Sequence, residues 1–195
     1  MHTYYSSQFK SSILTIHPGE HYASGDDILI STLLGSCITV TLFDPVLKSG
    51  GMNHFMLPHP GIITNPKDEN GKYGVHAMEL LINDLFKLGC RKERLQAKVF
   101  GGGTVLSSEA ENKYTSIPRG NIDFAFSFLN NEEIPLISSD TGGKKGRKIY
   151  FHPVTGKVYL QNIERRLILN ITENEKKYVR EIQKEKTQWG KTIIF

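Results

Sequence analysis

The sequence predicts a single α+β domain in which a mixed or antiparallel β-sheet is layered against flanking helices. Short segments with two-residue hydrophobic alternation recur along the chain, and one longer segment has clear helical periodicity. The strand segments follow one another mainly through hairpin turns rather than in strict β-α-β order, which favours α+β layers. The 195 residues, 38% of them hydrophobic, suffice for one buried core without disulfide support.

Three strands are predicted in the first third of the chain, after 25 residues that we expect to be irregular because they contain two turn signals. The firmest is Ile38–Phe43, where β-branched and aromatic residues alternate with period two before Asp44-Pro45 ends the strand. The other two are Asp27–Thr32 and Met52–Leu57. The pair Gly50-Gly51 is expected to lie in the loop before the third strand.

A polar surface loop at His59–Lys72 precedes the clearest helix, Tyr73–Leu88, whose apolar residues recur every three or four positions. Gly89 follows where a helix C-terminus favours positive φ. The remaining predicted elements are a strand at Gln96–Phe100, a helix at Asn121–Asn130, a strand at Ile134–Ser138, a hairpin of Lys148–Phe151 with Lys157–Gln161, and a helical tail at Glu173–Trp189. We therefore expect one domain over residues 1–166, followed by a basic C-terminal extension over residues 167–195.

The charge distribution argues against a nucleic-acid-binding protein. The formal net charge is +4, and most of this excess lies after Glu164 rather than on a broad basic face. The cluster KKGRK at Lys144–Lys148 is expected to be a solvated loop. No apolar run reaches the roughly 18 residues of a membrane-spanning helix, and the N-terminus lacks the pattern of a signal peptide. A cytoplasmic location without a disulfide framework is expected, since the chain has two cysteines.

Cys37 and His54 are the candidates for chemistry, because an imidazole can convert a thiol into a nucleophile. Strand parity places Cys37 on the face of Thr39 and Thr41, and so, we expect, outside the main apolar layer. The small residues Gly35 and Ser36 permit close approach of a substrate, and backbone N–H groups there could stabilise an oxyanion. The alternative is a small buried thiol near a histidine that makes one polar contact. The residues alone leave both interpretations open.

The strand register decides whether His54 faces Cys37. With Phe43 opposite Gly51, His54 would point to the other face of the hairpin. A slip of one residue, hosted by a bulge at Gly50-Gly51, would place His54 opposite Thr41 and on the face of the cysteine. A third group normally orients the base, and Ser31 and Thr32 lie upstream where a neighbouring strand could supply a hydroxyl.

Other motifs have simpler explanations. Gly101-Gly102-Gly103 follows a strand but lacks a phosphate-binding pattern, so close backbone approach near the site is expected. Asp140–Gly143 is expected to be a turn, with a binding role left open. Cys90 is expected to be structural, and Asn53 either shapes the pocket or only pairs in the sheet. His59, His76 and His152 lack the spacing of metal ligands, so no metal or cofactor is expected.

Several stretches together resemble the CheD family, the chemoreceptor glutamine deamidases of bacterial chemotaxis, over roughly residues 25–163. They are STLLGSCITVTLFDP from Ser31, GGMNHFMLP from Gly50, KYGVHAMELLINDL, AKVFGGG, RGN at Arg119–Asn121, and SSDTGGKKGRKIYFHPVTGKVYLQ. The resemblance implies a layered α+β sandwich similar to the cysteine hydrolase fold of the cytotoxic necrotizing factor toxins. The segment FGGGTVL departs from the family's usual pattern after the first two glycines, so residues 104–118 are expected to form an altered loop.

The resemblance also implies residue roles: Cys37 as the nucleophile, His54 as the base, and a hydroxyl six positions before the cysteine as the third member. That position is Ser31 here, where the family has threonine, and Thr32 is the alternative. The pocket and oxyanion residues would be Gly35, Ser36 and Asn53. The implied reaction converts receptor glutamine to glutamate through a thioester without a cofactor, with methylesterase activity as a side reaction. The alternative function is a binding module that mainly docks a CheC-type phosphatase.

Overall fold

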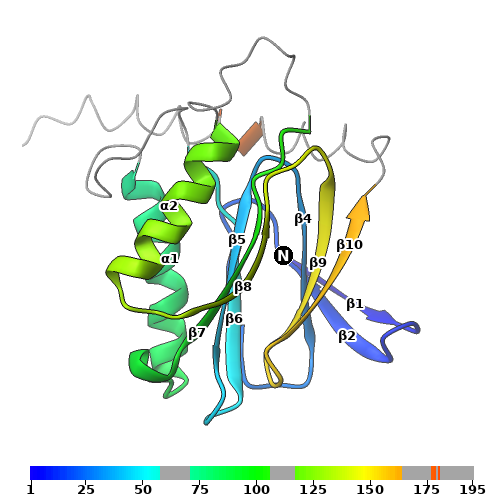
Figure 1. The fold of residues 1–195 in the computed structure, drawn as a ribbon. Helices are drawn as coiled ribbons and strands as arrows, with labels where there is room; N and C mark the ends of the chain where they lie inside the picture. The colour runs from blue at the N-terminus through cyan, green and yellow to red at the C-terminus, as the bar shows by residue number, and fades with distance from the viewer. Residues whose placement is uncertain (58–70, 106–116, 164–176, 179, 181–195) are drawn as a thin grey trace, which may run out of the picture.

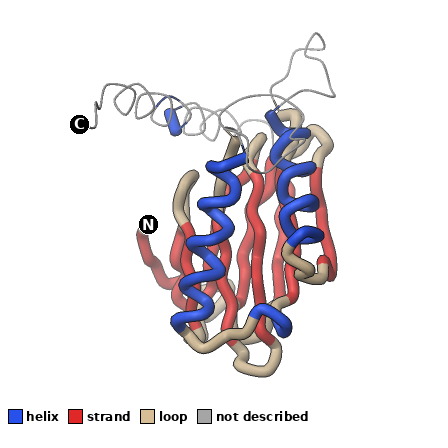
Figure 2. Tube along the Cα trace, turned by 90° about the vertical axis from the view of Figure 1, so that its left-hand side faces the viewer, coloured by secondary structure: helices blue, strands red, loops and turns tan. Residues whose placement is uncertain are grey.

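Two five-stranded sheets pack face to face in the computed structural model, and two helices cover the outer face of one of them (Figures 1 and 2). The structure describes residues 1–57, 71–105, 117–163, 177, 178 and 180. Within these residues no helix is both long and apolar enough to cross a membrane. The predicted α+β architecture is confirmed, with two sheets that each contain both parallel and antiparallel pairs.

The elements divide cleanly between the layers. The first sheet has the strand order β1 (His2–Ser6), β2 (Ser11–Thr15), β4 (Leu29–Leu34), β9 (Gly146–His152) and β10 (Lys157–Ile163). The second sheet has the order β3 (His21–Ser24), β6 (Ser49–Asn53), β5 (Ile38–Asp44), β7 (Gln96–Gly101) and β8 (Leu136–Thr141). The helices are α1 (Gly71–Lys87) and α2 (Ile117–Asn131), with a short 3-10 turn at Lys92–Arg94.

The expectation that the first 25 residues are irregular is wrong, because β1, β2 and β3 all lie within them. These strands bury few side chains: none of β1 is fully buried, and β2 buries only Ile13. A strand that covers little apolar surface has a weak two-residue pattern, and its pairing partners stabilise it instead. β2 pairs in parallel with β4, and β3 pairs with β6.

Most of the other predicted elements are confirmed with shifted ends. The strand predicted at Asp27–Thr32 is observed as β4, and the hairpin predicted near the C-terminus is observed as β9 and β10. α2 begins four residues earlier than expected, and Pro118 lies in its first turn. Gly89 caps α1 with a φ of +92°, as predicted. The loop at His59–Lys72 lies mostly outside the described residues, as do the domain boundary near residue 166 and most of the predicted tail helix.

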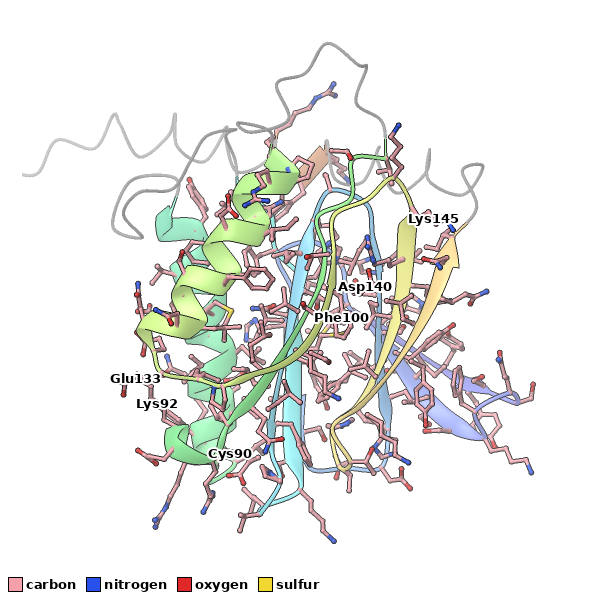
Figure 3. All side chains as sticks on the ribbon, in the orientation of Figure 1. Cys90, Lys92, Phe100, Glu133, Asp140 and Lys145 are labelled. Carbon is pink, nitrogen blue, oxygen red and sulfur yellow. The ribbon has the colours of Figure 1, made fainter. Side chains whose placement is uncertain are left out.

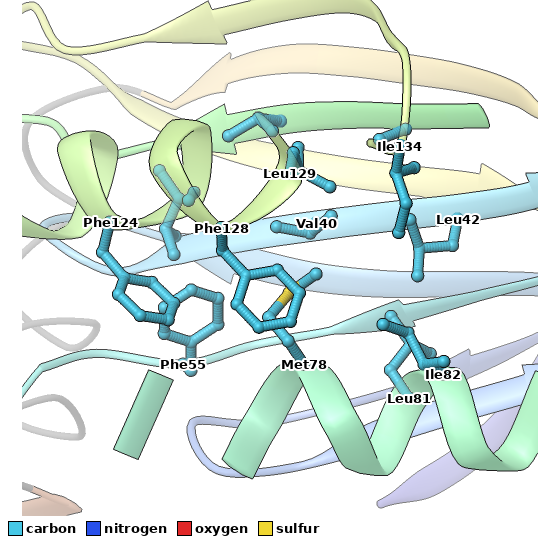
Figure 4. Packing of buried hydrophobic residues seen from close by; sticks show 14 of the residues in the cluster. Val40, Leu42, Phe55, Met78, Leu81, Ile82, Phe124, Phe128, Leu129 and Ile134 are labelled. Carbon is cyan, nitrogen blue, oxygen red and sulfur yellow. The ribbon is translucent and has the colours of Figure 1, made fainter. Parts of the chain in front are cut away.

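β5 separates two apolar layers, and each of its faces belongs to one of them. Ile38, Val40 and Leu42 belong to the core formed with α1 and α2, and Figure 4 shows Val40 and Leu42 among the side chains of the helices. The opposite face lies against the first sheet, and Cys37 is fully buried there among Ile30, Leu34 and other apolar side chains. Cys37 is therefore on the predicted face and outside the main apolar layer formed with the helices, as expected, but its own face is also buried, because the space between the sheets is a second core.

Gly50 and Gly51 lie inside β6, not in the loop before it, and they allow the layers to approach closely. The ladder between β5 and β6 is regular from Asp44↔Ser49 to Thr41↔Met52, so the predicted bulge at these glycines is absent from this ladder. A Cβ on Gly50 would lie 2.7 Å from the Phe151 ring of the first sheet. A Cβ on Gly51 would lie 2.6 Å from Leu81 of α1 and 2.8 Å from a backbone carbonyl oxygen.

We predict that Gly51→Ala lowers the free energy of unfolding by about 2–3 kcal/mol, because the backbone contact cannot be relieved by a side-chain rotation. Urea unfolding followed by circular dichroism measures this effect. Gly143→Ala is the comparison, since its Cβ would enter open space and only a φ of +74° opposes it, at a cost of about 1 kcal/mol. A Gly51→Ala variant as stable as the parent protein would contradict this packing explanation.

Candidate active site

The chain crosses from the first sheet to the second through Gly35, Ser36 and Cys37, between the end of β4 and the start of β5. Three carbonyl oxygens of this crossing accept hydrogen bonds from elsewhere in the molecule. Gly103 N–H donates to the Gly35 oxygen at 2.8 Å, Asn121 Nδ2 to the Ser36 oxygen at 2.9 Å, and Gly102 N–H to the Cys37 oxygen at 2.7 Å. The path of the crossing is thus fixed by the loop after β7 and by α2.

The glycines after β7 are required for this arrangement. Gly101 and Gly102 have φ values of +113° and +64°, and a Cβ on Gly101 would collide with the Cys37 carbonyl oxygen. A Cβ on Gly103 would lie 3.1 Å from the Gly35 oxygen. The prediction that this triplet serves close backbone approach is therefore confirmed.

His54 directly follows β6 and is almost completely buried between the sheets, with 2% of its surface exposed. Its backbone is anchored on both sides: its N–H donates to the Glu20 oxygen at 2.9 Å, and its oxygen accepts from Gly19 N–H at 2.8 Å. Its Nδ1 lies 2.7 Å from Oγ1 of Thr32, which belongs to β4. This contact joins the two sheets at the end of the sandwich where the chain crosses over.

The hydrogen bonds of Thr32 determine the tautomer of His54. Thr32 Oγ1 donates its single proton to the Ile16 carbonyl oxygen at 2.9 Å. The same oxygen can then only accept from the imidazole, so Nδ1 carries the proton and Nε2 carries the lone pair. Nε2 makes no hydrogen bond among the described residues, although it is buried. A buried nitrogen with an unused lone pair is the form of histidine that can take up a proton.

The register across β5 and β6 places His54 on the face of Cys37, but by a different slip from the predicted one. Thr41 lies opposite Met52, and Ile38 exchanges two hydrogen bonds with Phe55. This register puts His54 opposite Thr39 rather than Thr41. His54 and Cys37 are then diagonal neighbours on the inter-sheet face, a relation in which Cα atoms are usually about 7–8 Å apart.

Burial makes His54 a neutral side chain. Desolvation, with a smaller contribution from the nearby charge of His17, lowers the pKa of His54 from 6.5 to about 3. Cys37 is 0% exposed, so thiol and imidazole share an apolar environment. The arrangement therefore places a neutral imidazole and a shielded thiol on the same inter-sheet face.

The structure separates the two hydroxyl candidates by their contacts. Ser31 Oγ pairs with Thr15 Oγ1 at 2.9 Å, so its hydroxyl is engaged with β2. Ser31 and Thr32 are adjacent in β4 and project to opposite faces of the first sheet. Only Thr32 faces the second sheet, and it is the alternative, Thr32, that contacts His54.

Asn53 does not line the site with its side chain. Its Oδ1 accepts from Val40 N–H at 2.9 Å, and its Nδ2 donates to the Ala77 oxygen at 3.2 Å, on the side of α1. The simpler expectation, that Asn53 pairs within the sheet, matches this geometry. Asn121 was not among the predicted site residues, although the RGN stretch that contains it was noted. An asparagine at the start of the predicted helix is the sequence signal that could have pointed to it.

The remaining motifs lie outside the site or support it. Cys90 lies at the far end of the molecule from Lys145 (Figure 3), close to Asp44 at the other end of β5. Burial raises the pKa of Cys90 to about 11, which fits the expected structural thiol. Neither cysteine forms a disulfide. Asp140 is held by Arg147, whose Nε donates at 2.9 Å, and this pair closes the turn at Gly142-Gly143.

Fold and site together define a two-sheet α+β sandwich with a buried cysteine–histidine centre where the chain crosses between sheets. Residues 56–162 match the family described as CheD chemotactic sensory transduction. The chain is 44% identical over 176 residues to a protein of Shewanella oneidensis named as a probable chemoreceptor glutamine deamidase CheD 1, covering 90% of this chain and 84% of that one.

Two further relatives are likewise named as probable chemoreceptor glutamine deamidases CheD. The one from Methylobacillus flagellatus is 39% identical over 196 residues, which cover 98% of this chain and 94% of the relative. The one from Agrobacterium fabrum is 49% identical over 140 residues, which cover 71% and 74%. The chain belongs to the CheD family.

We predict that His54 makes the protein less stable as the pH falls from 6.5 to 5. The pKa of His54 is lowered on folding, so the unfolded chain binds a proton that the folded protein excludes, and acid favours unfolding. With an unfolded pKa near 6.5, the loss over this range is about 1.5 kcal/mol. Urea unfolding at both pH values measures it.

The His54→Gln variant should lose this pH dependence, whereas His76→Gln, at an exposed histidine of α1, should keep it. Carboxylates stay largely ionised in both states above pH 5, so they do not obscure the comparison. An unchanged slope in His54→Gln would show that His54 is not held neutral by burial.

Proposed function

We propose that this chain is a protein-glutamine deamidase that acts on methyl-accepting chemoreceptors, with Cys37 as the nucleophile and His54 as the base. The observation that carries the proposal is the Thr32–His54 hydrogen bond, which leaves the imidazole lone pair on Nε2 at the face shared with Cys37. The printed descriptions of the relatives supply the substrate class. Thr32 takes the orienting role that the family resemblance first suggested for Ser31.

In the proposed reaction, Cys37 Sγ attacks the side-chain carbonyl carbon of a glutamine while its proton passes to His54 Nε2. The carbonyl oxygen becomes an oxyanion, which backbone N–H groups of the Ser36–Cys37 turn stabilise. His54 then gives the proton to the departing nitrogen, ammonia leaves, and a thioester remains. Water gives a proton to His54 and attacks the thioester carbon, the carbon–sulfur bond breaks, and His54 returns the proton to the leaving Cys37 sulfur. The glutamic acid side chain is released and ionises to the carboxylate by losing its proton to the solvent.

Because the site is buried, the mechanism also requires a path by which the substrate reaches Cys37. Cys37 is fully buried, while Ser36 beside it is partly exposed. A receptor glutamine must therefore enter beside Ser36, and the chain around the thiol must move to admit it. Exclusion of water from the site protects the thiol until substrate is bound and strengthens hydrogen bonds to the oxyanion.

The same chemistry extends to related substrates and partners as further parts of this proposal. A glutamyl methyl ester presents the same acyl carbon with methanol as the leaving group, so methylesterase activity is the expected side reaction. Chemoreceptors expose their modified helices in the cytoplasm, which is the location we assign. A CheC-type phosphatase is a candidate partner, and a pull-down with the purified proteins would test it.

We predict that Cys37→Ala abolishes ammonia release from a chemoreceptor fragment, because no other described thiol lies near His54. Release is measured with a coupled glutamate dehydrogenase assay, and conversion of glutamine by mass spectrometry of the fragment. Cys90→Ala is the matched control and should retain turnover, since this thiol lies at the other end of β5. Normal turnover in Cys37→Ala would refute the mechanism and would leave docking of a partner as the better explanation.

We predict that Thr32→Val and Ser31→Ala differ strongly in activity although they change adjacent buried hydroxyls. Thr32→Val keeps the shape but removes the hydrogen bond that orients His54, so kcat should fall by about 100-fold. Ser31→Ala removes only the contact to Thr15, and kcat should change by less than about threefold. The opposite order of effects would return the orienting role to Ser31.

A further inference from the structure

Asn121 ties the crossing segment to the segment that follows His54. Its side chain is fully buried near the start of α2. Oδ1 accepts a hydrogen bond from Leu57 N–H at 2.8 Å, and Nδ2 donates to the Ser36 carbonyl oxygen at 2.9 Å. Since one partner is a donor and the other an acceptor, only one orientation of the amide satisfies both.

The bond to Ser36 fixes the peptide plane that contains the Cys37 nitrogen. In a planar trans peptide the carbonyl and the following N–H point in opposite directions. Asn121 holds the Ser36 oxygen, so it also sets the direction of the Cys37 N–H and the position of the Cys37 Cα. The carbonyl oxygens of Gly35 and Cys37 accept hydrogen bonds from the backbone N–H groups of Gly103 and Gly102, respectively. Asn121, by contrast, donates to this crossing from its side chain.

α2 has other anchors, which argues against a purely structural role for this amide. Ile122, Phe124, Ala125, Phe128 and Leu129 are all buried in the core between the helices and the second sheet. Phe124 packs edge-on against Phe55 with ring centroids 5.7 Å apart. The helix is therefore held by apolar contacts along its length, whereas the two side-chain hydrogen bonds of Asn121 go to the backbone of Ser36, before Cys37, and of Leu57, after His54.

We propose that Asn121 is a positioning residue for the nucleophile: it orients the Ser36–Cys37 peptide so that the thiol and the Cys37 N–H meet the substrate carbonyl together. This inference rests on the proposed role of Cys37. A hydrogen bond to the Ser36 oxygen also polarises that peptide and makes its N–H a stronger donor toward an oxyanion. Asn121 acts through Cys37 and takes no part in the proton transfers.

Asn121→Asp tests this role, because the variant keeps the shape and the acceptor for Leu57 but, when ionised, cannot donate to the Ser36 oxygen. With a chemoreceptor fragment as substrate, kcat should fall by about 10- to 100-fold while KM changes by less than about twofold. Burial raises the pKa of a carboxyl group, and the protonated acid can donate again. The ratio of variant to parent kcat should therefore rise as the pH is lowered.

Asp44→Asn is the matched control for lost stability. Asp44 is fully buried at the other end of β5, where its carboxylate pairs with Arg94 at 2.6 Å. The control should lower the unfolding temperature but leave kcat near that of the parent, with no recovery at lower pH. An equal loss of kcat in Asp44→Asn, or a kcat in Asn121→Asp that stays parental up to the highest pH at which the parent protein is folded, would overturn the inference.

Two additional measurements keep the test decisive. If Asn121→Asp does not fold, Asn121→Ser is assayed by the same criterion, and a parental kcat in it overturns the inference. In the parent protein, NMR should detect a coupling through the hydrogen bond between Asn121 Nδ2 and the Ser36 carbonyl, and its absence would also overturn it. Normal turnover in Cys37→Ala would refute the proposed function itself, whereas an inactive Cys37→Ala with a fully active Asn121→Asp would refute only the inference.

Discussion

The rest of the site depends on the short crossing between the two sheets. The chain leaves the first sheet at Leu34 and joins the second at Ile38, only four Cα steps later. Steps of 3.8 Å must cover the roughly 10 Å between packed sheets, and the chain bends at Gly35 and Ser36 on the way, outside either strand. The carbonyl groups of this crossing are satisfied instead by Gly102, Gly103 and Asn121, which come from distant parts of the sequence. The orientation of Cys37 is therefore a property of the whole sandwich.

The second constraint is a polar pair in an apolar layer. Thr32 and His54 meet between two sheets whose facing side chains are otherwise largely apolar. The threonine oxygen is fully used, since it donates to Ile16 and accepts from the imidazole, but His54 Nε2 is left without a partner among the described residues. A buried polar atom without a partner costs on the order of 1–3 kcal/mol. Such a cost persists in a folded protein where the atom has a task in function.

Strand faces and fold class, which depend on the local residue pattern, could be predicted from the sequence. Features that depend on how strands and sheets pair could not. The two-residue alternation of β5 correctly placed Cys37 on the face of the strand opposite to that of Ile38, Val40 and Leu42. The α+β fold class followed from the presence of both strand and helix periodicities in the sequence. It could not show that both faces of β5 are buried, because this requires knowledge of a second sheet. The direction of the register slip was also out of reach, since it depends on the turn after Asp44, whose carboxylate accepts from the N–H groups of Val46 and Leu47.

The choice between Ser31 and Thr32 illustrates the same limit at the level of one strand. Alternation normally identifies the inward face, but β4 has apolar residues at both parities: Ile30 and Leu34 face the second sheet, whereas Leu29 lies in a small cluster elsewhere. Thr32 lies on the same face of β4 as Ile30 and Leu34, which point toward the second sheet. The Thr32 hydroxyl is therefore the one that reaches His54. The family resemblance indicated Ser31 because it counts positions along the chain, whereas contact with His54 depends on the face of the strand.

The neutral state of His54 has a consequence for when the proton moves. With its pKa lowered to about 3, the imidazole does not hold a proton at neutral pH unless a negative charge develops beside it. In the proposed reaction such a charge appears first on Cys37 Sγ and then on the oxyanion, so protonation of His54 accompanies attack on the carboxamide rather than preceding it. The burial that costs stability at acidic pH is then the same property that couples proton transfer to substrate binding.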